Sequence, residues 1–124
     1  MDNKSASECV GGPKLIFACS GAADVGAVAD RAARRMTKEG IGKMFCLAGI
    51  GGRISGIMKT TESASKILAI DGCELDCVKS SLQQAGFAEF EHFRVTDLGM
   101  EKGKTSIDEE SIAKVAAEAT EMLS

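Results

Sequence analysis

The stretch KILAIDGC, residues 66–73, decides how this chain can fold. Its continuous apolar run, Ile67–Ile70, is typical of a strand that is buried on both faces of a parallel sheet. A glycine and a cysteine follow at the point where such a strand ends. From the cysteine onward, Leu75, Val78 and Leu82 recur at helical spacing until a glycine ends the pattern. The stretch therefore predicts a strand, a short turn and a helix, which together make one unit of an α/β sheet.

Strand-like apolar runs and helical patterns alternate along the rest of the chain. The expected strands are residues 15–18, 43–47, 66–70 and 90–96. The expected helices are residues 25–39, 54–60 and 73–85, and a last helix after a capping box at Ser106–Glu109. Because crossovers between parallel strands are right-handed, few topologies remain. We expect an α/β fold with a small open parallel sheet of about four strands in the order 2-1-3-4 and helices on both faces, as in Rossmann-like and flavodoxin-like domains.

Length and composition indicate one globular domain. The 124 residues are 44% hydrophobic, which suffices for a single core. We expect the polar, glycine-bearing residues 1–12 to be a flexible leader and residues 13–124 to be the domain. The sequence shows no signal-peptide hydrophobic region and no apolar run of membrane-spanning length, which predicts a cytoplasmic protein without a membrane partner. The net charge of −3 and the lack of Trp and Tyr argue against a nucleic-acid partner.

Four of the five cysteines lie where the ends of the strands would meet. Cys19 follows the first expected strand, Cys46 comes at the end of the second, and Cys73 follows the third, with Cys77 four residues later. Parallel strands end at one edge of a sheet and lie about 4.8 Å apart, so thiols from three strand ends can surround one ion. Four thiolates form the ligand set of a structural zinc site. An odd count of reduced thiols also argues against a disulfide framework.

The expected third helix places two of these thiols at its first turn. Cys73 and Cys77 are four residues apart and would share one helix face. The free N–H groups and the positive end of the helix dipole would favour a thiolate at Cys73 more than at Cys77. We interpret Asp71 as the N-cap of this helix rather than as support for a ligand, and Gly72 as a residue that the turn requires. The alternative for the cysteines is ordinary: buried cysteines often serve as small hydrophobic side chains.

These motifs resemble the DGC-domain family, which is named for an Asp-Gly-Cys triplet. The matching segments are CSG at 19–21, FCLAG at 45–49, AIDGCELDC at 69–77 and VTDLGMEKG at 95–103. Zinc binding through four cysteines is ascribed to that family, and the resemblance assigns this role to Cys19, Cys46, Cys73 and Cys77. It covers residues 14–104 and leaves Cys9 outside. The resemblance therefore implies a Zn²⁺ site. Because the biological role of the family is poorly defined, it does not say whether the metal serves metal handling, sensing or structural support.

Other chemistries stay open on the sequence alone. Cys46 and Arg53 are the residue types of a thiol active site of the phosphatase or arsenate-reductase kind. However, the number of residues between them is one larger than in such sites. The glycine-rich run before Arg53 has the composition of a phosphate-binding loop but lacks the ending of a P-loop. Cys73 and Cys77 permit a redox pair, and four cysteines also permit an iron–sulfur cluster. We interpret His92 as an exposed strand residue. A zinc-binding protein is the favoured hypothesis, and whether the protein is an enzyme is left open.

Overall fold

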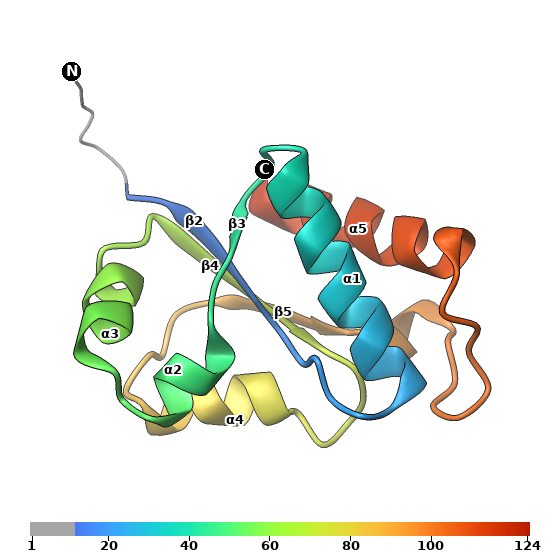
Figure 1. Ribbon diagram of the computed structural model, residues 1–124, viewed down its shortest axis with the longest axis horizontal. Coiled ribbons are helices and arrows are strands. Elements are labelled where there is room, and N and C mark those ends of the chain that lie inside the picture. Colours follow the sequence, from blue (N-terminus) through green and yellow to red (C-terminus); the bar gives the residue numbers. More distant parts are fainter. Residues whose placement is uncertain (1–11) are drawn as a thin grey trace.

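The structure describes residues 12–124, which form one sheet with helices on both of its faces. Figure 1 shows this computed structural model. The strands are β2 (Lys14–Ala18), β3 (Lys43–Met44), β4 (Lys66–Asp71) and β5 (Glu91–Arg94). The helices are α1 (Asp24–Lys38), α2 (Leu47–Gly51), α3 (Ser55–Glu62), α4 (Cys77–Gln84) and α5 (Glu109–Leu123), with a 3₁₀ turn, η1 (Val95–Leu98), after β5.

All the strands in this sheet run parallel, in the spatial order β3-β2-β4-β5. Counted along the chain, this is the order 2-1-3-4, so the predicted α/β fold and strand order are confirmed. The central pair, β2 and β4, is in register from Lys14 opposite Lys66 to Ala18 opposite Ile70. The edge strand β3 is only two residues long, and both of them pair with β2. The β3 edge of the sheet is therefore held by far fewer strand pairs than the centre.

The sheet separates two hydrophobic cores. Ile16 and Leu68 point to the face covered by α1 and α5, which pack against each other. Their neighbours Leu15 and Ile67 point to the opposite face, where α2, α3 and α4 lie (Figure 1). This alternation follows from the strand period of two, and it explains why the central strands are continuously apolar over residues 15–18 and 67–70.

The chain leaves β2 and β4 toward opposite faces of the sheet. After β2 it turns to α1 on one face, and after β4 it turns to α4 on the other (Figure 1). Between these two neighbouring strand ends lies the topological switch point of the sheet, the place where open α/β domains bind ligands. The strand order alone therefore predicts a ligand-binding position, at the edge between the ends of β2 and β4.

The glycine-rich run after β3 begins as a helix, whereas the sequence predicted a strand extending to residue 47. The strand ends at Met44, and Leu47–Gly51 form α2. A Cβ atom at Gly49 would lie 2.1 Å from the Cδ1 atom of Ile57 in α3. A side chain here would displace Ile57, so the glycine allows close packing between two helices rather than forming a phosphate-binding loop.

The third predicted helix begins later than expected, at Cys77 instead of Cys73. Asp76 adopts a left-handed conformation, with φ of 54°, and the chain from Gly72 to Asp76 is a loop. Leu75, expected on the inner face of the helix, lies in this loop and is 67% exposed. The prediction that Cys73 and Cys77 share a helix face is wrong, because Cys73 is not helical.

Two further boundaries differ near the C-terminal end of the chain. The predicted strand 90–96 stops at Arg94, and the chain continues as the 3₁₀ turn η1. The last helix begins after Asp108, whose carboxylate accepts a hydrogen bond from the amide of Ser111 at 3.0 Å. Asp108 therefore takes the capping role that the sequence assigned to Ser106.

No helix within residues 12–124 combines the length and the apolar character that a membrane span requires. The expected leader, residues 1–12, falls almost wholly outside the described residues, as does Cys9.

Candidate functional site

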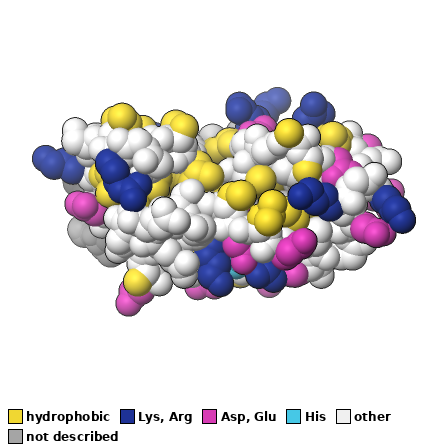
Figure 2. Space-filling model, turned by 90° about the horizontal axis from the view of Figure 1, so that it is seen from below, with side chains coloured by type: hydrophobic (Ala, Val, Ile, Leu, Met, Phe, Trp, Pro, Cys, Tyr) yellow, Lys and Arg dark blue, Asp and Glu magenta, His cyan; other side chains and the backbone are white. Residues whose placement is uncertain are grey.

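A cavity of about 380 Å³ opens at the switch point between the ends of β2 and β4. Three thiols line it, those of Cys19, Cys73 and Cys77. Its other lining residues are small or apolar except for one lysine; they are Gly21, Ala22, Ala23, Val25, Gly26, Gly72, Leu75 and Lys102. Figure 2 shows the molecule from below, with apolar side chains (yellow) near the middle of the visible face and charged side chains around them. Three of the four predicted ligands therefore share one cavity.

Cys19 is fixed by the sheet. Its amide donates to the carbonyl oxygen of Ile70 at 3.0 Å, which extends the pairing of β2 with β4 by one residue. Its sulfur lies beside two glycines: a Cβ atom at Gly21 or at Gly26 would be 3.2 Å from it. The absence of side chains at these two positions leaves space next to the sulfur.

Gly72 allows the β4–α4 loop to approach the start of α1. A Cβ atom at this position would lie 2.9 Å from the amide nitrogen of Gly26 and 3.1 Å from the carbonyl carbon of Val25. Both are backbone atoms, which cannot turn aside as a side chain can. The close approach brings Cys73, which is only 8% exposed, to the same cavity as Cys19. The glycine of the Asp-Gly-Cys triplet is therefore required for this close approach of the two backbones.

Asp71 caps α4 from a distance. Its side chain is 1% exposed, and its two oxygens accept hydrogen bonds from the amides of Val78 at 2.7 Å and Lys79 at 3.1 Å. The predicted capping role is thus right, although the N-cap position itself belongs to Asp76. Because these amides are in the first turn of α4, Asp71 also fixes where Cys77 begins the helix.

A second polar group lies behind the loop. The Nε2 atom of His92 is 2.9 Å from an Asp71 oxygen and 3.5 Å from an Asp76 oxygen. The guanidinium of Arg94 makes two hydrogen bonds of 2.7 Å to Asp76, and this ion pair lowers the pKa of the Asp76 carboxyl group. The side chain of His92 is 18% exposed, so its interpretation as an exposed strand residue is wrong. Strand alternation placed His92 on one face but could not show its partner.

The three side chains Asp71, Asp76 and His92 form the one group of potential metal ligands in residues 12–124 whose ligand atoms all lie within 4.8 Å of one another. Both oxygens of Asp71 already accept amide hydrogen bonds, and Asp76 is paired with an arginine. The group therefore stabilises the loop and the start of α4 rather than offering free ligand atoms.

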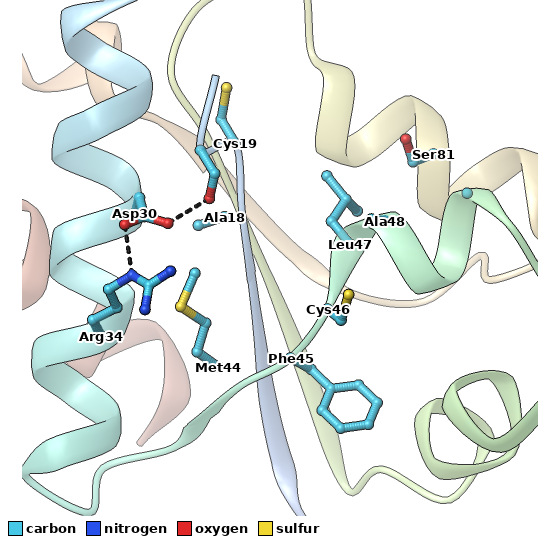
Figure 3. Close-up of a pocket in the computed structure, with 12 residues that line it drawn as sticks. Ala18, Cys19, Asp30, Arg34, Met44, Phe45, Cys46, Leu47, Ala48 and Ser81 are labelled. Carbon is cyan, nitrogen blue, oxygen red and sulfur yellow. Dashed lines mark hydrogen bonds and ion pairs between the residues drawn. The ribbon is translucent and has the colours of Figure 1, made fainter. Parts of the chain in front are cut away.

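Cys46 lies apart from the other three thiols. It is exposed and occupies the N-cap position of the five-residue helix α2. It lines a second pocket, of about 520 Å³, which Cys19 also lines. Figure 3 shows Cys19 and Cys46 on separate sides of this pocket, at the ends of different strands. Within the described residues, no three cysteine sulfurs lie within 4.8 Å of one another.

The charges around the thiols differ from the sequence expectation. Desolvation raises the pKa of the Cys77 thiol, with Cys19, Asp71 and Cys73 acting in the same direction and Lys102 in the opposite one. Cys77, not Cys73, is the thiol at the helix N-terminus. The Nζ atom of Lys102 lies 3.6 Å from the sulfur of Cys73. Cys73 therefore has a neighbouring cation, Lys102, and not the helix end that the sequence predicted.

Arg53 holds two helices together. Its guanidinium donates to the carbonyl oxygens of Ile50 at 2.8 Å and Gln84 at 2.8 Å, near the C-terminal ends of α2 and α4. Arg53 does not line the pocket of Cys46. This arrangement gives no support to an anion-binding thiol site built from Cys46 and Arg53.

Comparison with known proteins agrees with the motifs. The family model described as "DGC domain" matches residues 15–119, a span that holds Cys19, Cys46, Cys73 and Cys77. The "Anaerobic and virulence modulator AnvM" of Pseudomonas aeruginosa is 34% identical over 88 residues, which cover 71% of this chain and 67% of that protein. No solved structure matches the chain. The predicted resemblance is confirmed: this chain belongs to the DGC-domain family.

Proposed function

We propose that the protein binds one zinc ion at the carboxyl edge of its sheet, with the thiolates of Cys19, Cys46, Cys73 and Cys77 as ligands. The observation that carries the proposal is the cavity at the switch point, which three of these thiols line. Sheets of this order bind their ligands at that position. The fourth thiol, Cys46, lines the adjacent pocket, and Cys19 lines both.

The residues present suit a thiophilic metal ion. The donors are sulfur atoms in a mainly apolar cavity, a set that favours zinc over magnesium or calcium. The glycines at positions 21 and 26 leave space beside the sulfur of Cys19. Tetrahedral zinc with Zn–S bonds of about 2.3 Å places its sulfurs roughly 3.8 Å apart, so binding requires the thiols to move closer. The loop from Gly72 to Asp76, which is neither helix nor strand, is where that movement is expected.

A site closed by four sulfurs binds metal without activating water. Hydrolytic zinc sites keep one ligand position for water, and here all four positions would be taken by protein. We therefore propose metal binding, and not hydrolysis, as the function of this edge. X-ray absorption of the zinc-loaded protein tests the ligand set, because it should detect sulfur neighbours only. An oxygen or nitrogen neighbour in place of one sulfur would contradict the four-thiolate site.

The decisive experiment is metal analysis of the full chain purified without added metal. We expect about one zinc per chain and a colourless protein, since zinc, unlike an iron–sulfur cluster, does not absorb visible light. Serine at any of the four ligand positions should lower zinc affinity. The matched control is Cys9→Ser, because Cys9 lies outside both the described residues and the matched family region. Absence of zinc from the wild-type chain, or equal loss in the control, would overturn the proposal.

A further inference from the structure

Lys102 is the one charged residue that lines the three-thiol cavity within the described chain. Its ammonium nitrogen lies 3.6 Å from the sulfur of Cys73, within hydrogen-bonding reach of sulfur. The charge of Lys102 also lowers the pKa of the Cys77 thiol, which opposes the increase caused by burial. A site made of four thiolates alone gives this lysine no role. Lys102 lies far along the chain from the cysteines, in a turn after η1.

A short turn, residues 101–105, presents Lys102 to the cavity. Within this turn, the hydroxyl of Thr105 donates to the carbonyl oxygen of Glu101 at 2.7 Å, and Gly103 has a positive φ of 89°. Such a conformation favours glycine, which allows the chain to reverse tightly just after Lys102. The position of the lysine is thus set by backbone geometry as well as by its contact with sulfur.

Asp24 holds the 101–105 turn against the first helix. Its two carboxylate oxygens accept hydrogen bonds from the amides of Gly103 and Thr105, each at 2.9 Å. These bonds lower the pKa of Asp24, and the amide of Gly103 has the largest effect. Asp24 is the first residue of α1, two residues before Gly26, whose missing side chain leaves space beside Cys19. The turn is therefore fixed to the same structure that surrounds the thiols.

The charge of a loaded site makes this cation important. Zn²⁺ with four thiolates carries a net charge of −2, and with three thiolates −1, whereas neutral thiols carry none. An ammonium next to the cavity therefore stabilises the loaded site more than the empty one, whichever number of thiolates binds. An apolar surrounding strengthens that attraction.

We infer that Lys102 determines how tightly the metal is held, by donating a hydrogen bond to the Cys73 sulfur, and that Asp24 positions it through the 101–105 turn. This inference rests on the proposed zinc site. Lys102 is not a ligand, since its ammonium has no lone pair to offer. Its role is to offset negative charge and to orient one sulfur.

The test measures zinc affinity of the full chain by competition with a chromophoric chelator. Lys102→Met should weaken zinc binding about tenfold, the lower end of what neighbours of metal ligands cost. Lys102→Arg, which keeps the charge, should retain most of the affinity. Asp24→Ala should weaken binding in the same direction by a smaller factor. The matched control is Lys104→Met in the same turn, whose ammonium is 3.8 Å from the exposed Glu101 and should leave affinity unchanged.

A spectroscopic readout separates a hydrogen bond to sulfur from a general effect on the fold. In the cobalt-loaded protein, Lys102→Met should shift the sulfur-to-metal charge-transfer band, and Lys104→Met should not. Wild-type affinity in Lys102→Met, alongside loss of binding in Cys73→Ser, would overturn the inference and leave the zinc site standing. Equal weakening by Lys102→Arg and Lys102→Met would overturn the role of charge. A wild-type chain that binds no zinc would overturn both proposals.

Discussion

The four cysteines lie at two parts of the carboxyl edge of the sheet, and the fold holds these two parts with different firmness. At the switch point, Cys19 extends the central strand pair, and Gly72 brings the loop that carries Cys73 against the backbone of α1. At the β3 edge, Cys46 is exposed between a two-residue strand and the five-residue helix α2. The difference predicts unequal roles in the proposed site: Cys19 and Cys73 are anchored by the sheet and by α1, whereas Cys46 joins from a weakly supported edge.

Loss of a switch-point thiol should have the largest effect and would sharpen this comparison. We expect Cys73→Ser to weaken zinc binding by more than about 100-fold, because even neighbours of metal ligands cost 10–100-fold. Cys46→Ser should cost less, roughly tenfold, since three thiolates plus water still complete a tetrahedral site. Chelator competition on the two variants measures the ratio. Equal losses would show that the four thiols form one unit and that the prediction of unequal roles is wrong.

The close approach at Gly72 offers a way to break the switch point without touching a thiol. We expect Gly72→Ala to lower the free energy of unfolding by about 1–3 kcal/mol, because its Cβ would overlap backbone atoms of Val25 and Gly26. Zinc affinity should fall with it as the loop moves away from α1. Denaturant unfolding measures the stability. The control is Gly56→Ala in α3, where a Cβ meets nothing within 4 Å and stability should be unchanged or slightly higher.

The ion pair between Asp76 and Arg94 predicts a pH dependence of stability. Because the folded-state pKa of Asp76 lies below its ordinary value of 3.8, its contribution is complete above that value and is lost as the pH falls through the lowered pKa. Asp76→Asn keeps a residue type that tolerates the left-handed conformation and should cost roughly 1 kcal/mol at pH 7.

The measurement is the difference in unfolding free energy between wild type and Asp76→Asn across pH. It should shrink as the pH falls below about 4. Asp97→Asn is the control: Asp97 is 50% exposed and 3.9 Å from the Arg94 guanidinium, and an Asn oxygen can still accept the 3.1 Å hydrogen bond from the Arg94 amide. A difference that grows toward low pH would contradict this origin of the stability.

Metal removal should have the smallest effect on the fold. Both faces of the sheet bury their own apolar core, and of the four proposed ligands only Cys73 is a buried member of either core. Chelation should therefore leave the far-UV circular dichroism almost unchanged while raising hydrogen exchange in the loops that carry the thiols. Complete loss of the helical signal would show that the cores are too weak to stand without metal.

The sequence predicted the sheet because its strands are short, apolar and followed by loops, and because right-handed crossovers limit the topology. The helix α2 escaped prediction because LAGIG has poor helix propensity, and packing of Gly49 against Ile57 stabilises it. The start of α4 was misplaced because Asp71 caps it from seven residues before Val78, a contact that local patterns do not encode. For the same reason the sequence named four thiols but neither Lys102 nor the partner of His92, which tertiary contacts alone reveal.

The bonds from Asp24 to the 101–105 turn join residues 79 and 81 positions apart. Since a chain leaves the ribosome from its N-terminus, every thiol of the edge emerges well before Lys102 does. A nascent chain therefore presents its sulfurs to the surrounding solution without their ammonium neighbour. This edge acquires its full charge environment only when the 101–105 turn has been synthesised and has folded back onto the first helix.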